Sequence, residues 1–126
     1  MKTVTLENYR KDTYYPKVVM AMDRVLKNGN LVTPIDVFLA IGMLEPAKLK
    51  EWKNGRVAYL EQVINGNLSK FSRVLRILRF HAHDLNLRPQ SCVERNGKKA
   101  LRYSKSGSKK LEEVYSCGYL RVENKE

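Results

Sequence analysis

The chain has 126 residues, about the length of one domain, and its 43% hydrophobic and 29% charged residues are typical of a folded globular protein. No stretch approaches the roughly 18 apolar residues of a membrane span, the first residues lack a secretory signal, and two cysteines, Cys92 and Cys117, exclude a disulfide framework, so we expect a cytoplasmic protein with reduced thiols. The formal net charge of +11 disfavours a basic partner and favours a polyanion such as nucleic acid.

The first predicted element is an amphipathic helix. Apolar residues recur at helical spacing over residues 18–26, and the segment that carries them starts near Tyr14 and ends at Asn28-Gly29. The residues before Tyr14 are polar and show no sustained period, so they predict no regular element.

A pair of short helices joined by a glycine turn is predicted next. Thr33-Pro34 combines an N-cap residue with proline at the first helical position, so a helix runs from Pro34 to about Ile41. Gly42 supplies a left-handed cap, and Glu45-Pro46 starts a second helix that Asn54-Gly55 ends. The pattern resembles a helix-turn-helix, whose second helix reads bases, and a simple helical hairpin is the alternative. The residues in position to read bases are Lys48, Lys50 and Lys53.

Two further helices are predicted before the period changes. The first covers residues 57–64 and is interrupted by Gly66, and the second is the longest periodic segment of the chain, from Leu68 to Leu85. Pro89 closes this segment, because the residue before a proline is pushed out of the helical region. One face of the long helix is expected to enter the core, and it carries Leu68, Phe71, Leu75, Leu78, Ala82 and Leu85.

A basic flank of the long helix lies roughly 130° from that apolar face. Between Lys70 and His83 there is no Asp or Glu, so the i, i+4 acids that accompany a merely solvated helix face are missing. We expect this flank, the arginine ridge, to bind phosphate oxygens through the donor forks of arginine. A solvated face, or salt bridges to Glu45, Glu51 or Glu61, is the alternative. The arginine ridge comprises Lys70, Arg73, Arg76 and Arg79.

After the long helix the period becomes that of strands. Segments 92–95 and 100–104 flank Asn96-Gly97, which is a strong signal for a hairpin turn. The basic turn resembles the wing of a winged-helix domain, which touches the sugar-phosphate backbone, and the alternative is a cationic turn that keeps an edge strand soluble. A short helix over 111–115 and a strand over 118–122 are expected to follow. The hairpin residues expected to bind phosphates are Arg95, Lys98, Lys99 and Arg102.

The positive charge is local rather than spread along the chain. Twelve Lys or Arg residues between Lys70 and Lys110 stand against two acids, Asp84 and Glu94, which is a local excess of +10. This distribution is typical of a surface that meets a polyanion, because cations displace condensed counterions from phosphates.

A metal hypothesis arises at His81, His83 and Asp84, since histidine and aspartate ligate zinc, manganese and iron. On a helix, residues i and i+2 point about 200° apart, so His81 and His83 cannot hold one ion. We therefore expect no metal, no cofactor and no catalytic residue, and we expect Asp84 to pair with Arg88 or with backbone donors. No serine lies in a G-x-S-x-G context, and no phosphate-binding glycine loop is present.

Two segments carry a resemblance that spans most of the chain. Residues 52–61 read W-K-N-G-R-V-A-Y-L-E and residues 76–87 read R-I-L-R-F-H-A-H-D-L-N-L, and with 33–37 and 101–107 they resemble a family of small bacterial proteins of uncharacterised function. The resemblance implies a bacterial origin and one continuous domain. It implies no activity and transfers no catalytic residue.

These patterns predict a mainly α protein with a small C-terminal β-hairpin or sheet, in the α+β class. We expect a bundle of four to five helices, which in one interpretation is winged-helix-like. A single domain, 1–126, is expected to hold a helical region over about 14–88, a basic β-hairpin region over about 90–122, and a frayed end at 123–126.

The expected function is non-catalytic binding of nucleic acid, with duplex DNA as the favoured form. The alternative is a protein–protein interaction or adaptor module that binds an acidic partner through the arginine ridge or an apolar patch around Trp52, Val57 and Tyr59. A metal-dependent nuclease-like enzyme is the remote alternative. Base reading, DNA against RNA, and formation of a homodimer stay open.

Overall fold

The computed structural model describes residues 8–122, and the expected frayed end at 123–126 lies outside this range. Five α-helices and two small antiparallel sheets occur within it, which confirms the predicted α+β class. The helices are η1 (Tyr9–Lys11, 3-10), α1 (Tyr15–Lys27), α2 (Pro34–Ala40), α3 (Pro46–Lys53), η2 (Leu60–Gln62, 3-10), α4 (Leu68–Asp84) and α5 (Lys109–Ser116). The strands are β1 (Leu31–Val32), β2 (Arg88–Ser91), β3 (Arg95–Asn96), β4 (Lys99–Ala100) and β5 (Cys117–Leu120).

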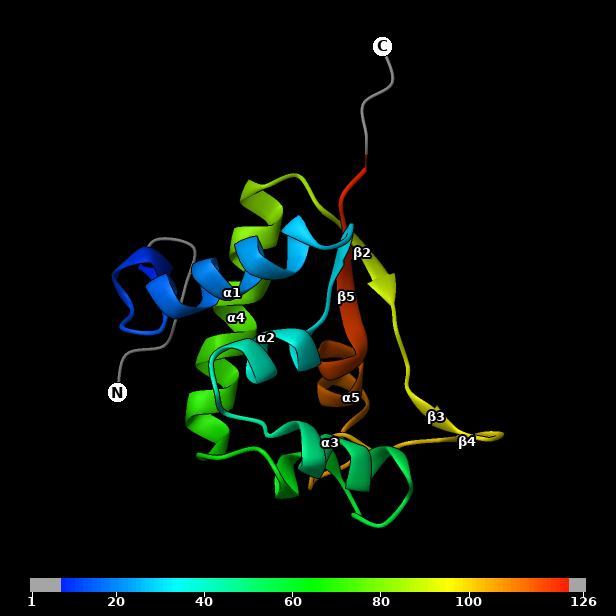
Figure 1. The fold of residues 1–126 in the computed structure, drawn as a ribbon. Helices are drawn as coiled ribbons and strands as arrows, with labels where there is room; N and C mark the ends of the chain where they lie inside the picture. Colours follow the sequence, from blue (N-terminus) through cyan, green and yellow to red (C-terminus); the bar gives the residue numbers. More distant parts are fainter. Residues whose placement is uncertain (1–7, 123–126) are drawn as a thin grey trace.

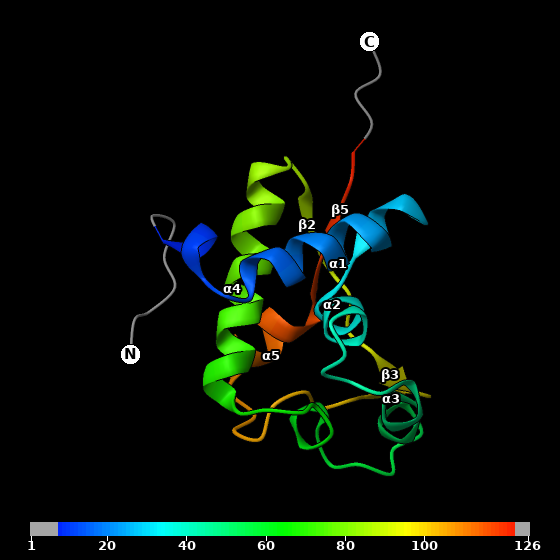
Figure 2. The same ribbon diagram turned by 60° about the vertical axis from the view of Figure 1, so that its left-hand side comes forward.

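The long helix α4 organises the other elements. Helix α1 crosses α4, and α2 packs against both α1 and α5 (Figures 1 and 2). The chain leaves α1 and α4 directly into the three-stranded sheet, while α3 and the β3–β4 hairpin lie farther from α1. The hairpin projects from the side of the molecule opposite α4 in both views.

The three-stranded sheet pairs a strand from the first third of the chain, β1, with strands from the last third, β2 and β5. Its order is β1-β5-β2, and the central strand β5 pairs antiparallel with both neighbours, with Leu31 opposite Leu120 and Ser91 opposite Cys117. Strands β1 and β2 escape prediction because β1 has two residues, and β2 contains Pro89, which an edge strand tolerates. The predicted strand over 118–122 is present as β5.

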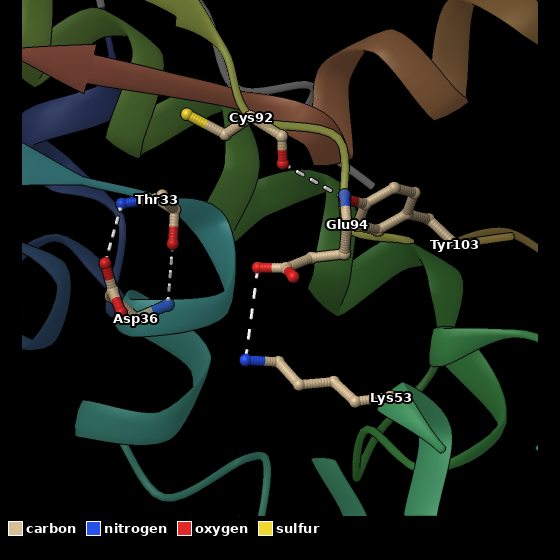
Figure 3. A network of polar contacts seen from close by, with 6 residues as sticks. All are labelled: Thr33, Asp36, Lys53, Cys92, Glu94 and Tyr103. Carbon is tan, nitrogen blue, oxygen red and sulfur yellow. Dashed lines mark hydrogen bonds and ion pairs between the residues drawn. The ribbon is translucent and has the colours of Figure 1, made fainter. Parts of the chain in front are cut away.

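The predicted helices α1 to α4 are confirmed within one or two residues. Helix α2 starts with a complete capping box, in which Asp36 N donates to Thr33 Oγ1 (3.2 Å) and Thr33 N donates to Asp36 Oδ2 (3.1 Å) (Figure 3). Gly42 ends this helix with a φ of 82°, as a left-handed cap requires.

The predicted helix over 57–64 is wrong. Only the three residues of η2 are helical there, because two backbone donors of the segment are used by a distant loop. Leu60 N donates to Arg102 O (3.1 Å), and Glu61 N donates to Tyr103 O (2.9 Å). These bonds hold the segment along the chain that follows the hairpin, so local periodicity is overridden by a tertiary pairing.

A row of packed aromatic rings links α3 to α4 through the core. Ring centroids are 5.0 Å apart for Trp52 and Tyr103, 6.1 Å for Tyr103 and Tyr115, 6.4 Å for Tyr115 and Phe38, and 5.9 Å for Phe38 and Phe71. All five side chains are buried, so the row fixes the position of α3 relative to the rest of the core.

The predicted core face of α4 is correct only in its middle. Leu68 and Leu85 are 53% and 45% exposed, whereas Val74 and Ile77, which lie off that face, are fully buried. The helix is buried on more than one side, with α1 and the chain around η1 against part of it. The remaining buried residues of α4 are Phe71, Leu75, Leu78 and Ala82.

Candidate nucleic-acid interface

Seven exposed cations lie on helix α3, on the turn after it and on the hairpin, and we call this region the α3–hairpin surface because the end of α3 contacts the base of the hairpin. Lys53 Nζ lies 4.0 Å from Glu94 Oε1 at the base of the hairpin, and Figure 3 shows its side chain extending from α3 toward that carboxylate. A methyl group on Gly55 would lie 2.9 Å from the Asn96 side-chain nitrogen, so the turn after α3 packs closely on β3. The cations of the α3–hairpin surface are Lys48, Lys50, Lys53, Arg56, Arg95, Lys98 and Lys99.

Trp52 holds α3 against the chain that leaves the hairpin. Its indole is fully buried on the Tyr103 ring, and its Nε1 donates to Arg102 O at 2.8 Å. Trp52 therefore adds no exposed surface to the predicted apolar patch, whereas its other two members, Val57 and Tyr59, are half-buried. Tyr103 is 2% exposed and belongs to the core, so it is not available to stack on a base.

The hydroxyl of Tyr103 fixes the base of the hairpin. It accepts from Glu94 N at 2.8 Å and donates to Cys92 O at 3.3 Å, so both of its hydrogen-bonding functions are used (Figure 3). Burial raises the pKa of Tyr103 to about 12, which keeps the hydroxyl protonated at every physiological pH. The direction in which the hairpin projects is thus set by a buried side chain.

The hairpin itself is shorter than predicted. Arg95 pairs with Ala100 and Asn96 with Lys99, so the turn is Gly97-Lys98, and Gly97 takes a φ of 63° that glycine adopts without strain. Residues 92–94 and 101–104, expected in strands, are not paired in this sheet.

The cations of the α3–hairpin surface differ in their partners. Within the described range, Lys48, Lys50, Lys98 and Lys99 have no acidic partner, while Arg56 Nη1 lies 3.6 Å from Glu51 Oε2. Arg56 is not among the residues predicted from the sequence, because no local pattern shows that the turn after α3 meets the hairpin.

Arg102 differs from the other predicted hairpin residues. Its Nε donates to Ser104 O at 2.8 Å, its Nη2 donates to Lys105 O, and its guanidinium lies over the Tyr59 ring. The donor fork of Arg102 thus closes its own loop, which corrects the prediction that it grips phosphate with the hairpin tip.

The arginine ridge on α4 is divided by the fold. Arg73 makes a bidentate ion pair with Asp12, with Nη2 to Oδ1 at 2.8 Å and Nε to Oδ2 at 3.0 Å, and it stacks over Tyr14. The Asp12 side chain is 9% exposed; burial alone raises its pKa, but the bonds from Arg73 and from Tyr14 N outweigh it, so the pKa is lowered. Arg73 is therefore removed from the predicted phosphate contacts. Its partner is Asp12 rather than Glu45, Glu51 or Glu61, which were the predicted alternatives.

Arg76 and Arg79 lie elsewhere, on the side of α4 that faces α5. Both line a groove with Lys110, whose register against α4 no local sequence pattern predicts. Lys70 is exposed at the start of α4, beside Gly66. The hairpin and α4 lie on opposite sides of the fold, so the predicted phosphate-binding residues do not form one surface (Figures 1 and 2).

The two histidines and Asp84 have separate environments. His81 is half-buried against the Tyr15 ring, and burial lowers its pKa, whereas His83 is exposed. Asp84 accepts from Tyr9 and from Arg10 (2.9 Å), which lowers the pKa of Asp84 and corrects its expected pairing with Arg88. No group of three potential metal ligands is found among residues 8–122.

Comparison with protein-family models, with curated proteins and with solved structures finds no match to the chain. The resemblance to small bacterial proteins therefore stays a prediction. In the described part of the chain no helix has both the length and the apolar character needed to cross a membrane.

Proposed function

We propose that this protein is a non-catalytic nucleic-acid-binding protein that grips duplex DNA through the α3–hairpin surface. The observation that carries the proposal is the contact between the end of α3 and the base of the hairpin, marked by Lys53 and Glu94. Two basic segments about 40 residues apart in sequence share one surface as a result. The proposal includes the cytoplasmic location that the sequence predicts.

The shape of this surface suits a duplex. Helix α3 has eight residues and exposes Lys50 and Lys53 one turn apart, while its large apolar residue Trp52 is turned into the core. An α-helix fits the major groove of DNA, and a hairpin beside it reaches the sugar-phosphate backbone. The β3–β4 hairpin lies in the connection between two paired strands, β2 and β5, and resembles a wing in this respect.

The buried support under the surface favours binding without large rearrangement. Trp52 and Tyr103 are packed and hydrogen-bonded, so the lysines stand on a fixed backbone even though their side chains are mobile in solvent. Preorganised cations lose less entropy on binding than cations on an unsupported loop. This support is the reason for placing the interface here rather than on the separated arginine ridge.

The salt dependence of binding to a labelled duplex of about 20 base pairs tests the proposal, because each phosphate contact contributes about −0.9 to the slope of log K against log[salt]. The triple variant Arg95→Gln, Lys98→Gln, Lys99→Gln removes three hairpin cations and is expected to bring the slope about 2.7 closer to zero. Fluorescence anisotropy over a KCl series gives both slopes.

A matched control separates this surface from net charge. Lys11→Gln, Lys17→Gln, Arg24→Gln removes three exposed cations from η1 and α1 and leaves the hairpin intact. We expect its slope to equal that of the unmodified protein. Equal loss in the two triple variants, or no detectable binding by the unmodified protein to duplex DNA, overturns the proposal.

A further inference from the structure

A groove between α4 and α5 lies apart from the α3–hairpin surface. It consists of two hollows of about 490 and 350 Å³ that adjoin each other, because they share Arg79, Phe80, Lys110 and Val114. Along α4 the groove runs from Ser72 to His83, which at 1.5 Å per residue is about 16 Å. The groove therefore has the length of three helical turns.

The floor of the groove is apolar and its rim is basic. Four of the six floor side chains lie on α4 and α5, and the other two lie just before β2 and in β5. Four of the six are only half-buried, so apolar surface faces solvent. The rim carries Arg76, Arg79, His83 and Lys110 against one acid, Glu113. The floor comprises Leu75, Phe80, Leu87, Leu111, Val114 and Tyr119.

Arg79 is exposed and belongs to the lining of both hollows. Burial raises the pKa of Tyr119, at the far end of the floor, and the charge of Arg79 lowers it by less. Lys110 also lines both hollows, so a ligand in either hollow lies beside both cations.

A DNA backbone does not fit this combination. Phosphates satisfy the rim cations but cover an apolar floor with charge, which costs desolvation without filling the hollow. A compact small molecule fills one hollow and leaves the other open to water. The occupant that satisfies both floor and rim is elongated, apolar on one side and acidic along its edges.

We propose that the α4–α5 groove binds a short amphipathic helix, with an acidic flank, from a partner protein. Apolar side chains at i, i+3, i+4 and i+7 fill the floor, and carboxylates beside them pair with Arg79 and Lys110. Charge complementarity favours an acidic partner helix, since the basic rim repels a basic helix and attracts an acidic one. This inference goes beyond nucleic-acid binding and does not depend on it.

A synthetic helix tests the proposal directly. The probe is a fluorescein-labelled peptide of about 12 residues, long enough for the groove, with one leucine face and a glutamate flank. We expect saturable binding to the full chain by fluorescence anisotropy. The double variant Arg79→Glu, Lys110→Glu, which changes two exposed side chains, is expected to weaken binding by at least about tenfold.

Two controls keep the result specific. Lys98→Glu, Lys99→Glu makes the same charge change in the hairpin and is expected to leave peptide binding within about twofold while it weakens DNA binding. A peptide with serine in place of leucine retains the acids and is expected not to bind. Equal binding of the serine peptide, or equal loss in the two double variants, overturns the groove proposal and leaves the DNA proposal standing.

Discussion

The α3–hairpin surface and the α4–α5 groove are both basic, yet they differ in what lies between their cations. Under the first surface the large apolar side chains, Trp52 and Tyr103, are buried and hydrogen-bonded, so neither of them is presented to a partner. In the groove, half-buried side chains such as Phe80 and Val114 separate the cations. Net charge therefore selects the sign of a partner's charge, whereas the exposed apolar surface selects the class of partner.

The difference arises from the helices that carry the cations. Helix α3 has eight residues and one fully buried large side chain, Trp52. The loop that contains Arg102 and Tyr103 is sufficient to cover this side chain. Helix α4 has 17 residues with apolar positions around much of its circumference. Helix α1 and the chain around η1 cover part of it, Phe38 of α2 contacts it at Phe71, and α5 borders a groove beside the rest.

The largest effect is expected from Trp52→Ala, which removes the buried side chain that supports the α3–hairpin surface. Deleting a fully buried indole costs about 3–5 kcal/mol of unfolding free energy. Urea unfolding measures the loss, and Leu49→Ala, at a half-buried position of the same helix, is the control with a smaller expected cost. A loss below about 1 kcal/mol for Trp52→Ala contradicts the role given to this side chain.

A smaller effect is expected from Tyr103→Phe, which removes the hydroxyl that fixes the hairpin base. The change leaves Glu94 N without its acceptor and costs about 1–3 kcal/mol, with faster hydrogen exchange at that amide. Tyr59→Phe is the control, because the Tyr59 hydroxyl makes no hydrogen bond within residues 8–122. Peptide binding in the groove is expected to stay unchanged, and unaltered exchange at Glu94 is the contrary result.

The smallest effect concerns the pair Asp12 and Arg73. A double-mutant cycle with Asp12→Asn and Arg73→Gln is expected to give a coupling of about 1 kcal/mol at neutral pH. Because folding lowers the pKa of Asp12, this stability is fully present above its unfolded pKa of about 3.9 and is lost as pH falls through the lower folded value. Urea unfolding of the unmodified protein, the two single variants and the double variant, at pH 7 and in acid, measures the coupling energy and its pH dependence.

Arg73→Gln also tests the division of the arginine ridge. We expect it to leave the salt slope of DNA binding unchanged, since its guanidinium is held by Asp12. A slope nearer zero by about 0.9, without loss of stability, restores Arg73 as a phosphate contact.

Local signals predicted most of the fold. Thr33-Pro34 specified the start of α2, and the apolar period of α4 located that helix within a residue. Non-local pairing defeated prediction over 57–64, where backbone donors reach Arg102 and Tyr103. Two-residue strands such as β1 carry too few residues to show a period.

The site was predictable in composition but not in arrangement. The hairpin cations follow from Asn96-Gly97 and their spacing, whereas no local pattern shows that Gly55 packs on β3 or that Lys110 lines a groove with Arg79. The ion pair between Arg73 and Asp12 joins residues that are 61 positions apart. The absence of acids within α4 therefore does not show that Arg73 lacks an acidic partner. Tertiary contacts decide which cations share a surface.

The direct test of the account compares two charge reversals in one assay, DNA binding to a labelled duplex over a KCl series. Lys98→Glu, Lys99→Glu is expected to weaken binding by more than about tenfold and to bring the salt slope about 1.8 closer to zero. Arg79→Glu, Lys110→Glu is expected to leave affinity within about twofold and the slope unchanged. Equal weakening by the two reversals contradicts the account, because it shows that the two basic regions act as one.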